Sequence, residues 1–381
     1  MRFVAVPWQV FLITRSTVAV GLIGLVELVP LVVFSIFGGA VADVRDRKWI
    51  MLLSQIGLLG TSVALVLVSL TDRPSLPAIY AITGLASAIN SFDRPARSAM
   101  LPNLVSAAQL PAAMALRQVV FQTTTIIGPA IAGLLLAAID IAWVYAIDAA
   151  TFLAAIVALR WVPSIVPEQD EEDASYLERM RQGLAFSFGT PFILSIFVID
   201  LVAMITGSPR SVMPALAEQT FDIGASGLGL LYAAPAAGAL VAALTTGWVS
   251  RVRRQGMAVL VAVTLWGAAI TGAGLAVFSL PLTLLLLAVA GGADVVSAIF
   301  RGTMLQEATP DGLRGRVSAV NLMVVTGGPR IGDIEAGLVA GVVGAPSSIV
   351  IGGAACLAGT AVVAGAFPSL RKYVAPKTEE S

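Results

Sequence analysis

The feature that most constrains the fold is a succession of apolar segments long enough to cross a lipid bilayer. A membrane helix needs about 20 predominantly apolar residues to span about 30 Å of hydrocarbon. Eleven segments of the chain meet this requirement. They lie near residues 17–41, 49–70, 76–100, 112–137, 141–161, 189–213, 224–249, 257–278, 281–304, 316–342 and 346–367. The sequence therefore predicts an all-α membrane protein.

The composition supports the same conclusion. The chain is 57% hydrophobic and 12% charged. A water-soluble domain of this size could not bury so much apolar surface.

The apolar run at 3–14 would form only about 18 Å of helix at 1.5 Å per residue, which is too short to span a bilayer alone. We interpret it as the outer part of a first helix, which the sequence predicts to be truncated.

Lysine and arginine are distributed unevenly between the two sides of the predicted bundle. One side holds eighteen of them, counting Arg301, and the other side holds Arg15, Arg73 and Arg210. Positive residues collect in the cytoplasmic loops of inner-membrane proteins. The sequence therefore predicts a multi-pass protein of the bacterial inner membrane with a cytoplasmic C-terminus.

The second part of the chain repeats the first. At a shift of 208 residues the following pairs coincide: Gly39 with Gly247, Trp49 with Met257, Gly84 with Gly292, Phe92 with Phe300 and Pro102 with Pro310. After the loop at 102–112 the shift becomes 204, which pairs Gly128 with Gly332 and Gly133 with Gly337. Such a repeat predicts two bundles of similar structure.

The repeat sets the predicted domain boundaries. We expect an N-terminal transmembrane bundle at 1–161, a cytoplasmic linker at 162–187, a C-terminal transmembrane bundle at 188–367 and a cytoplasmic tail at 368–381. The linker carries a run of acidic residues, which is typical of a hydrated connector.

Several function classes are excluded by residues that the chain lacks. It has no histidine and a single cysteine, Cys356, so disulfide frameworks, zinc sites and histidine-based catalytic triads are not expected. The formal net charge is zero, which gives no indication of nucleic-acid binding. We expect no cofactor, no metal and no enzymatic activity.

The loop after the second predicted helix carries a charged motif. It reads Gly39-Ala40-Val41-Ala42-Asp43-Val44-Arg45-Asp46-Arg47-Lys48. This spacing resembles the G-x-x-x-D-x-x-x-R-K/R signature of the major facilitator superfamily. The resemblance implies that Asp43 and Arg47 join a charge cluster that holds the cytoplasmic ends of the two bundles together. The alternative is a helix end followed by ordinary cytoplasmic charges.

The fourth predicted helix ends in a second charged segment. It reads Ser91-Phe92-Asp93-Arg94-Pro95-Ala96-Arg97. Opposite charges at a helix end can stabilise one conformation by pairing and release it on protonation. We predict Asp93 as the partner of Arg47. A helix stop at the prolines is the equally weighted alternative.

The fifth predicted helix contains Gly128-Pro129-Ala130-Ile131-Ala132-Gly133. Proline bends a helix, and small residues leave room for a neighbouring helix at the bend. The segment resembles the G-P-x-x-G-G antiporter signature, with Ala132 in place of one glycine and Thr124 in place of the upstream glycine. The resemblance implies export, and ordinary small-residue packing is the alternative.

Together with four other segments, these motifs resemble one branch of the superfamily. The segments are Trp8-Gln9, Glu27-Leu28-Val29-Pro30, the stretch from Phe92 to Pro102, and Gly328-Pro329-Arg330-Ile331-Gly332-Asp333. That branch contains enterobactin exporters and macrolide efflux proteins. The resemblance implies the major facilitator fold and a monomeric secondary exporter of a small amphipathic substrate, a siderophore or a drug. It also implies that helices one, four, seven and ten line a cavity.

Ionisable groups at bilayer depth are costly unless they face protein, water or a partner, so each is a candidate functional residue. The candidates for proton coupling or the cavity are Glu27, Asp294, Asp200, Arg330, Asp333 and Glu335. Without histidine a transported proton must bind a carboxylate, and Glu27 and Asp294 are the first choices. A structural pair of Arg330 with Asp333, and helix-to-helix hydrogen bonds at Asp200 and Asp148, are the alternatives.

Two rival functions come from other classes. A membrane enzyme is disfavoured because the sequence offers no catalytic constellation. A transporter-like protein without activity, acting as a membrane partner or sensor, remains an alternative.

Overall fold

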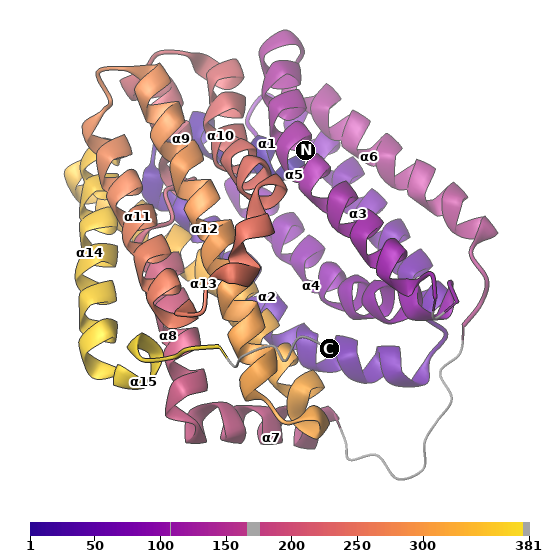
Figure 1. Ribbon diagram of the computed structural model, residues 1–381. Helices are drawn as coiled ribbons and strands as arrows, with labels where there is room; N and C mark the ends of the chain where they lie inside the picture. The colour runs from indigo at the N-terminus through magenta and orange to yellow at the C-terminus, as the bar shows by residue number, and fades with distance from the viewer. Residues whose placement is uncertain (107, 166–175, 376–381) are drawn as a thin grey trace.

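The computed structural model describes residues 1–106, 108–165 and 176–375, and the regular structure within them is helical throughout (Figure 1). Each of the eleven predicted segments contains a long helix. They are α2 (Thr17–Val44), α3 (Arg47–Ser69), α4 (Leu76–Met100), α5 (Leu110–Ala138), α6 (Ile141–Ala158), α8 (Pro191–Thr206), α10 (Gly224–Leu244), α11 (Gln255–Leu275), α12 (Leu280–Ala308), α13 (Arg314–Val343) and α14 (Ala345–Ala366). Within the described residues, eight stretches are long and apolar enough to cross a membrane. The predicted all-α membrane class is confirmed.

Short polar residues and one glycine set the ends of these helices. Asp46 caps α3 by accepting a hydrogen bond from the Lys48 N–H at 2.9 Å, and Asp140 caps α6 in the same way through Ala142 at 2.8 Å. Such caps satisfy backbone donors that a helix start leaves free. Gly344, with φ of 85°, ends α13 and lets α14 begin at the next residue.

The short apolar run at 3–14 forms a helix as expected: α1 (Arg2–Thr14) contains 13 residues and Pro7. One predicted segment differs from the prediction. The sixth, expected as one helix over 189–213, is interrupted. After α8 it continues as η3 (Arg210–Val212), α9 (Met213–Ala215) and η4 (Leu216–Thr220). The interruption follows Gly207-Ser208-Pro209 because proline lacks the N–H that a continuing helix requires.

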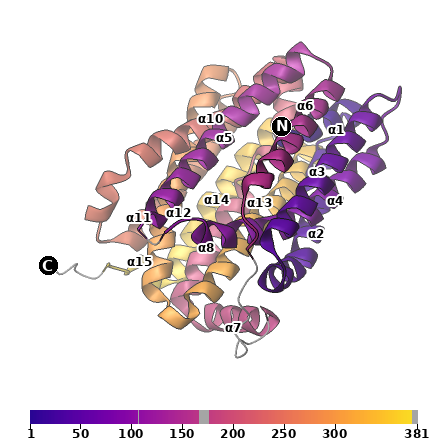
Figure 2. The ribbon, with the colours of Figure 1, turned by 90° about the vertical axis from the view of Figure 1, so that its right-hand side faces the viewer.

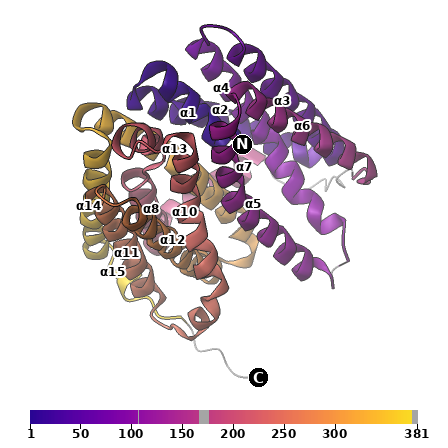
Figure 3. The ribbon, with the colours of Figure 1, turned by 90° about the horizontal axis from the view of Figure 1, so that it is seen from above.

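The helices form two bundles with matching internal contacts. In the N-terminal bundle (α1–α6), α4 packs on α2 and α3, and α3 packs on α6. In the C-terminal bundle (α8–α14), α12 packs on α10 and α11, and α11 packs on α14. The starts of α5 and α13, at residues 110 and 314, differ by the predicted shift of 204. Figure 3 shows the two bundles side by side.

Two glycine crossings join the bundles and are related by the repeat. On α2 and α13, a Cβ added to Gly337 would lie 2.7 Å from the Cα of Gly21. On α10 and α5, a Cβ added to Gly133 would lie 2.5 Å from the Cα of Gly229. The repeat shifts of 208 and 204 relate Gly21 to Gly229 and Gly133 to Gly337. The two crossings are therefore pseudo-twofold equivalents, as the sequence predicts for two similar bundles.

The linker contributes a helix that marks one end of the molecule. Residues 166–175 lie outside the described part, but the remainder contains α7 (Tyr176–Gly189), which packs on α13. Figures 1 and 2 place α7 beyond the same end of the bundles, and α15 (Pro368–Arg371) lies near that end. We call it the α7 end. The glycine crossings lie toward the opposite end, where α2 and α10 begin. The bounds of the four predicted segments stay a prediction.

Candidate functional site

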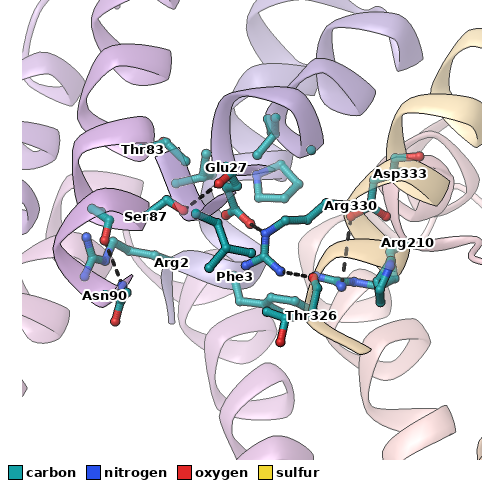
Figure 4. A pocket seen from close by; sticks show the side chains of 18 of the residues that line it. Arg2, Phe3, Glu27, Thr83, Ser87, Asn90, Arg210, Thr326, Arg330 and Asp333 are labelled. Atoms are coloured by element: carbon teal, nitrogen blue, oxygen red, sulfur yellow. Dashed lines mark hydrogen bonds and ion pairs between the residues drawn. The ribbon is translucent and has the colours of Figure 1, made fainter. Parts of the chain in front are cut away.

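A cavity of about 540 Å³ lies between the two bundles (Figure 4). Its walls come from α1, α2 and α4 on one side and from η3, α10 and α13 on the other. The polar and charged residues that line it are Arg2, Glu27, Thr83, Ser87, Asn90, Arg94, Arg210, Ser211, Tyr232, Thr326, Arg330 and Asp333. Its volume lies within the range typical of small-molecule sites, about 300–1,000 Å³.

An ion pair between Glu27 and Arg330 joins the two bundles at the wall of the cavity, where α2 and α13 are in contact. The Arg330 Nε lies 3.1 Å from the Glu27 Oε2. The Arg330 Nη1 also donates to the carbonyl oxygen of Thr326 at 2.6 Å, which fixes the guanidinium against its own helix. On the other wall, the Ser87 hydroxyl donates to the backbone oxygen of Glu27 at 2.7 Å. The pair therefore joins α2 to α13 at the cavity (Figure 4).

A second pair lies beside the first. The Arg210 Nη1 is 4.0 Å from the Asp333 Oδ2, and the Arg210 Cζ lies 4.2 Å from the centroid of the Phe3 ring. The Tyr232 hydroxyl donates to the backbone oxygen of Arg210 at 2.9 Å, and the rings of Phe3 and Tyr232 meet edge to face at 5.4 Å. The predicted structural pair of Arg330 with Asp333 is not formed, because Arg330 pairs with Glu27 instead.

Arg210, which the sequence places among the few positive residues of the non-cytoplasmic side, lies in the wall of the cavity. The residue belongs to η3, which contacts both α2 and α13, and its side chain lines the cavity. The signal that could have located it is Gly207-Ser208-Pro209, since interrupted helices often build the binding sites of transporters.

Positive charge exceeds negative charge in the cavity wall. The arginines are Arg2, Arg94, Arg210 and Arg330, and the carboxylates are Glu27 and Asp333. Four minus two leaves an excess of two positive charges. Arg2 has a partner behind the wall, since its Nε lies 3.0 Å from the Asp148 Oδ2. Asp148 also accepts a hydrogen bond from Ser62 of α3 at 2.7 Å, which confirms the predicted helix-to-helix bond.

The other candidates from the sequence lie away from this cavity. Asp200 of α8 and Asp294 of α12 both pair with Arg301 of α12, and none of the three lines the cavity. Sequence reasoning counted Arg301 with the cytoplasmic charges, but the residue is buried within α12. Its spacing of seven residues from Asp294, two helical turns, could have indicated a shared face. Glu335 lies half-buried on α13 and does not line the cavity.

The charged motif at the α7 end is arranged differently from the prediction. Asp93 is buried and pairs with Arg97, one turn along α4, at 3.0 Å, and it accepts a hydrogen bond from Gln55 of α3 at 3.1 Å. Arg47 instead donates to the backbone oxygen of Ala99 at 3.0 Å. The predicted pair of Asp93 with Arg47 is therefore not formed in this conformation.

The remaining residues of the two charged segments lie in different surroundings. Lys48 lies 3.5 Å from the backbone oxygen of Arg160, and the exposed Arg94 lines the cavity. The side chain of Asp43 lies outside the described part. Gly39 is buried, but the close approach of α2 to α4 occurs at Gly38, where a Cβ would meet the backbone of Ser91.

Asp46, in the same loop, has several hydrogen-bond donors around its carboxylate. It accepts hydrogen bonds from the Ser164 hydroxyl and from the N–H groups of Lys48 and Ile165. Partial burial alone would raise the pKa of Asp46, but these hydrogen bonds outweigh it and hold the pKa below its ordinary value. The carboxylate thereby ties the segment after α6 to the start of α3.

The glycines of the antiporter-like motif are not equivalent. A Cβ on Gly133 would collide with α10 at Gly229, whereas a Cβ on Gly128 would meet no atom within 4 Å. Pro129 lies inside α5 and is buried. In this conformation the motif provides one close inter-bundle contact, at Gly133.

Comparison with known proteins identifies the family. The family model described as transmembrane secretion effector matches residues 1–378. The chain belongs to this family of major facilitator transporters. The resemblance seen in the motifs is confirmed. The chain is a multi-pass membrane transporter and not an enzyme, since the family and its relatives are transporters.

Two curated relatives of this chain are enterobactin exporters. EntS of Shigella boydii serotype 18 is 32% identical over 321 residues, which cover 83% of this chain and 76% of the relative. EntS of Escherichia coli O1:K1 is 31% identical over 321 residues with the same coverage.

Solved structures of transporters resemble this chain in fold. A mutant of the nucleoside transporter NupG superposes with a TM-score of 0.77 at 15% identity, covering 97% of this chain and 95% of that one. A bacterial homologue of ferroportin in an inward-facing state gives a TM-score of 0.73 at 14% identity, covering 97% and 94%. Both comparisons support the predicted fold of two pseudo-symmetric bundles.

Proposed function

We propose that this transporter exports a catecholate siderophore of the enterobactin type across the cytoplasmic membrane. The observation that carries the proposal is the cavity between the bundles, with its excess of two positive charges. A catechol is a weak acid with an aromatic ring, so guanidinium groups can bind both its oxygens and its ring face. The relatives at 31–32% identity export enterobactin, which supports the same class of cargo.

A macrolide or another drug is the second candidate. Macrolides carry a basic amine, which the excess of arginine would repel. The charge of the cavity therefore favours the siderophore. A transporter-like protein that serves only as a membrane partner or sensor needs no charged cavity of this size.

We propose transport by alternating access, with a single chain as the working unit. The glycine crossings close the cavity toward the end opposite α7, while the cavity extends to the exposed Arg94 near the α7 end. Without Arg301, which is buried in α12, seventeen of the eighteen positive residues counted on the side that includes α7 remain, and this excess supports a cytoplasmic position for that side. In this orientation the C-terminus is cytoplasmic and the conformation is inward-open. Export then requires the crossings to separate as the α7 end closes.

We propose a proton as the coupling ion. The chain has no histidine, so a carboxylate must bind the proton, and Glu27 and Asp294 are the candidates. Protonation of one of them would permit closure of the inward cavity, while the cargo competes for the ionised state. Export should then depend on an imposed pH gradient.

The direct test uses an enterobactin-producing host that lacks its own exporter. Expression of the chain should restore catecholate secretion to the medium, and in vesicles the transport should respond to a pH gradient. The same strains are tested for macrolide sensitivity. Resistance without catecholate secretion would establish the drug as cargo, and neither phenotype would favour the inactive partner.

A further inference from the structure

A second buried charge cluster lies inside the C-terminal bundle, away from the cavity. It consists of Arg301, Asp200 and Asp294. Arg301 forms an ion pair with Asp200 of α8, and its Nη2 lies 3.7 Å from the Asp294 Oδ1. Arg301 and Asp200 are 8% and 3% exposed. One guanidinium thus faces two carboxylates.

The helices around this cluster supply no further charge. α12 packs on α8, α10 and α11. α10 and α11 contain no Asp, Glu, Lys or Arg, and Asp200 is the single such residue of α8. Arg301 therefore compensates one carboxylate, and the second is left without a counter-charge. An uncompensated charge inside an apolar bundle is strongly unfavourable unless something neutralises it.

The pocket beside the cluster restricts what the neutralising species can be. Its lining includes Asp294, Ser297 and Arg301, together with apolar residues of α8 and α11. Ser297 is 1% exposed, and its hydroxyl has no hydrogen-bond partner among the described residues. The pocket has no room for a water molecule. A metal cation needs several oxygen ligands and space for them, so a proton is the species that fits.

The two carboxylates differ in access. Asp200 is enclosed and lies against Arg301, whereas 40% of the Asp294 side chain is accessible. By contrast, each cavity carboxylate has its own arginine, Glu27 with Arg330 and Asp333 with Arg210. The cavity pairs are balanced one to one, whereas Asp294 combines an uncompensated charge with a partly accessible side chain.

We propose that Asp294 is the proton-binding group of this transporter and that Asp200 stays ionised as the permanent partner of Arg301. This inference rests on the proposed proton-driven export and selects Asp294 over Glu27. In the open conformation Asp294 exchanges its proton with water. Closure of the α7 end would bury Asp294, and the proton removes the charge that would otherwise oppose this burial. The cargo cavity and the proton site are then separate, and they communicate through the movement of the C-terminal bundle.

The first experiment measures the proton directly and needs no cargo. Infrared difference spectra of the purified protein are recorded between about pH 9 and about pH 5, where a protonated carboxyl band is expected to appear. Asp294→Asn should lose this band. Glu335→Gln, a half-buried carboxylate on α13 that lines no cavity, should keep it. A band that persists in Asp294→Asn would overturn the proposal.

The second experiment separates coupling from cargo binding. In proteoliposomes with enterobactin as the probe, Asp294→Asn should keep exchange of cargo between the two sides within about twofold, and lose at least about tenfold of the accumulation driven by a pH gradient. Glu335→Gln should keep both activities. Accumulation in Asp294→Asn that equals the parent, with the same pH response, would refute the proton site.

A further variant covers the case in which Asp294→Asn is poorly folded. Asp200→Asn leaves one carboxylate for one guanidinium, so Asp294 should become the permanent partner of Arg301, and the infrared band should vanish although Asp294 is still present. Retention of the band in Asp200→Asn would contradict the charge balance. Failure of the parent protein to move enterobactin would instead count against the proposed function, because the infrared result does not depend on cargo.

Discussion

Arg330 illustrates how single residues connect the two bundles. It follows Pro329 on α13, and its guanidinium reaches Glu27 of α2 at 3.1 Å. Both side chains are partly buried, at 16% and 32% exposed, so each charge depends on the other for compensation. A partly buried ion pair of this kind is screened less by water and salt than an exposed surface pair, and it contributes more to stability. The same pair also gives the cavity one of its cations.

Removal of this guanidinium should affect both stability and transport. Arg330→Gln leaves Glu27 without its partner, which should lower the free energy of unfolding by about 1.5–3 kcal/mol and abolish export of an acidic cargo. The control is Arg314→Gln, which breaks an exposed pair with Asp311 and should cost less than about 1 kcal/mol. Thermal unfolding in detergent and cargo export measure the two effects.

A charge swap distinguishes the pair from the individual residues. Glu27→Arg and Arg330→Glu should each destabilise the protein, and the double variant should recover most of the lost stability. Equal destabilisation by the double and single variants would show that the two residues do not act as a pair.

Asp46, at the α7 end, should make the stability of the folded protein depend on pH. Its pKa is lowered in the folded protein, so its contribution to stability is complete above the ordinary value of about 3.9 and is lost as pH falls through the folded value. Asp46→Ala should cost about 1 kcal/mol near neutral pH through loss of the cap. It should also flatten the decline in stability between about pH 5 and pH 2.

Ser164→Ala provides the matched variant for this effect. It removes one hydrogen bond to the carboxylate but leaves the bonds from Lys48 and Ile165, so it should retain part of the acid-side decline. Unfolding midpoints of the parent and both variants, measured across this pH range, show how much of the acid-side decline each variant retains. An unchanged pH profile in Asp46→Ala would show that this carboxylate does not control it.

At the level of helices, the sequence was sufficient to predict most of what the structure contains. Apolar length located the eleven segments, and the repeat related α5 to α13 through the shift of 204. The interruption at Gly207-Ser208-Pro209 was missed because hydropathy averages over a window and does not register a local loss of backbone hydrogen bonds. The partner of Asp93 was missed because the choice between Arg47 and Arg97 depends on helix rotation, which charge spacing alone does not determine.

The glycine crossings give a prediction for α5. Gly133→Ala would place a methyl group against Gly229 of α10, and such overpacking should cost about 1–3 kcal/mol and slow transport. Gly128→Ala, in the same motif, meets open space and should change the unfolding temperature little. Thermal unfolding and export rates of the two variants form the comparison. Equal effects would show that the motif acts through something other than this contact.

At the level of the whole molecule, the two bundles are equivalent in architecture but not in charge. The repeat relates Asp93 of α4 to Arg301 of α12 at the shift of 208, so equivalent positions carry opposite charges. In the N-terminal bundle Asp93 has Arg97 as its own partner, whereas in the C-terminal bundle Arg301 serves two carboxylates. The sequence alone could not assign these pairs, because partners such as Glu27 and Arg330 belong to different bundles and meet only in the folded molecule.

The direction in which the cavity opens can be tested with single cysteines. Cys356 is the one cysteine in the chain and is fully buried, so an introduced cysteine is the reactive one. Asn90→Cys, in the cavity wall on α4, should react with a membrane-impermeant maleimide in inverted vesicles. In intact cells it should react at least about tenfold more slowly, since a closed end restricts access.

Two exposed loop positions calibrate this labelling. Asp72→Cys reports the end opposite α7, and Asn103→Cys reports the α7 end. If Asn90→Cys reacts with the maleimide in the same preparation as Asn103→Cys, and Asn103→Cys reacts only in inverted vesicles, the cavity opens to the cytoplasm as proposed. If Asn90→Cys instead reacts in the same preparation as Asp72→Cys, the resting protein is open at the other end. Added enterobactin should slow labelling of Asn90→Cys but of neither loop position, because only the cavity wall lies within reach of the cargo.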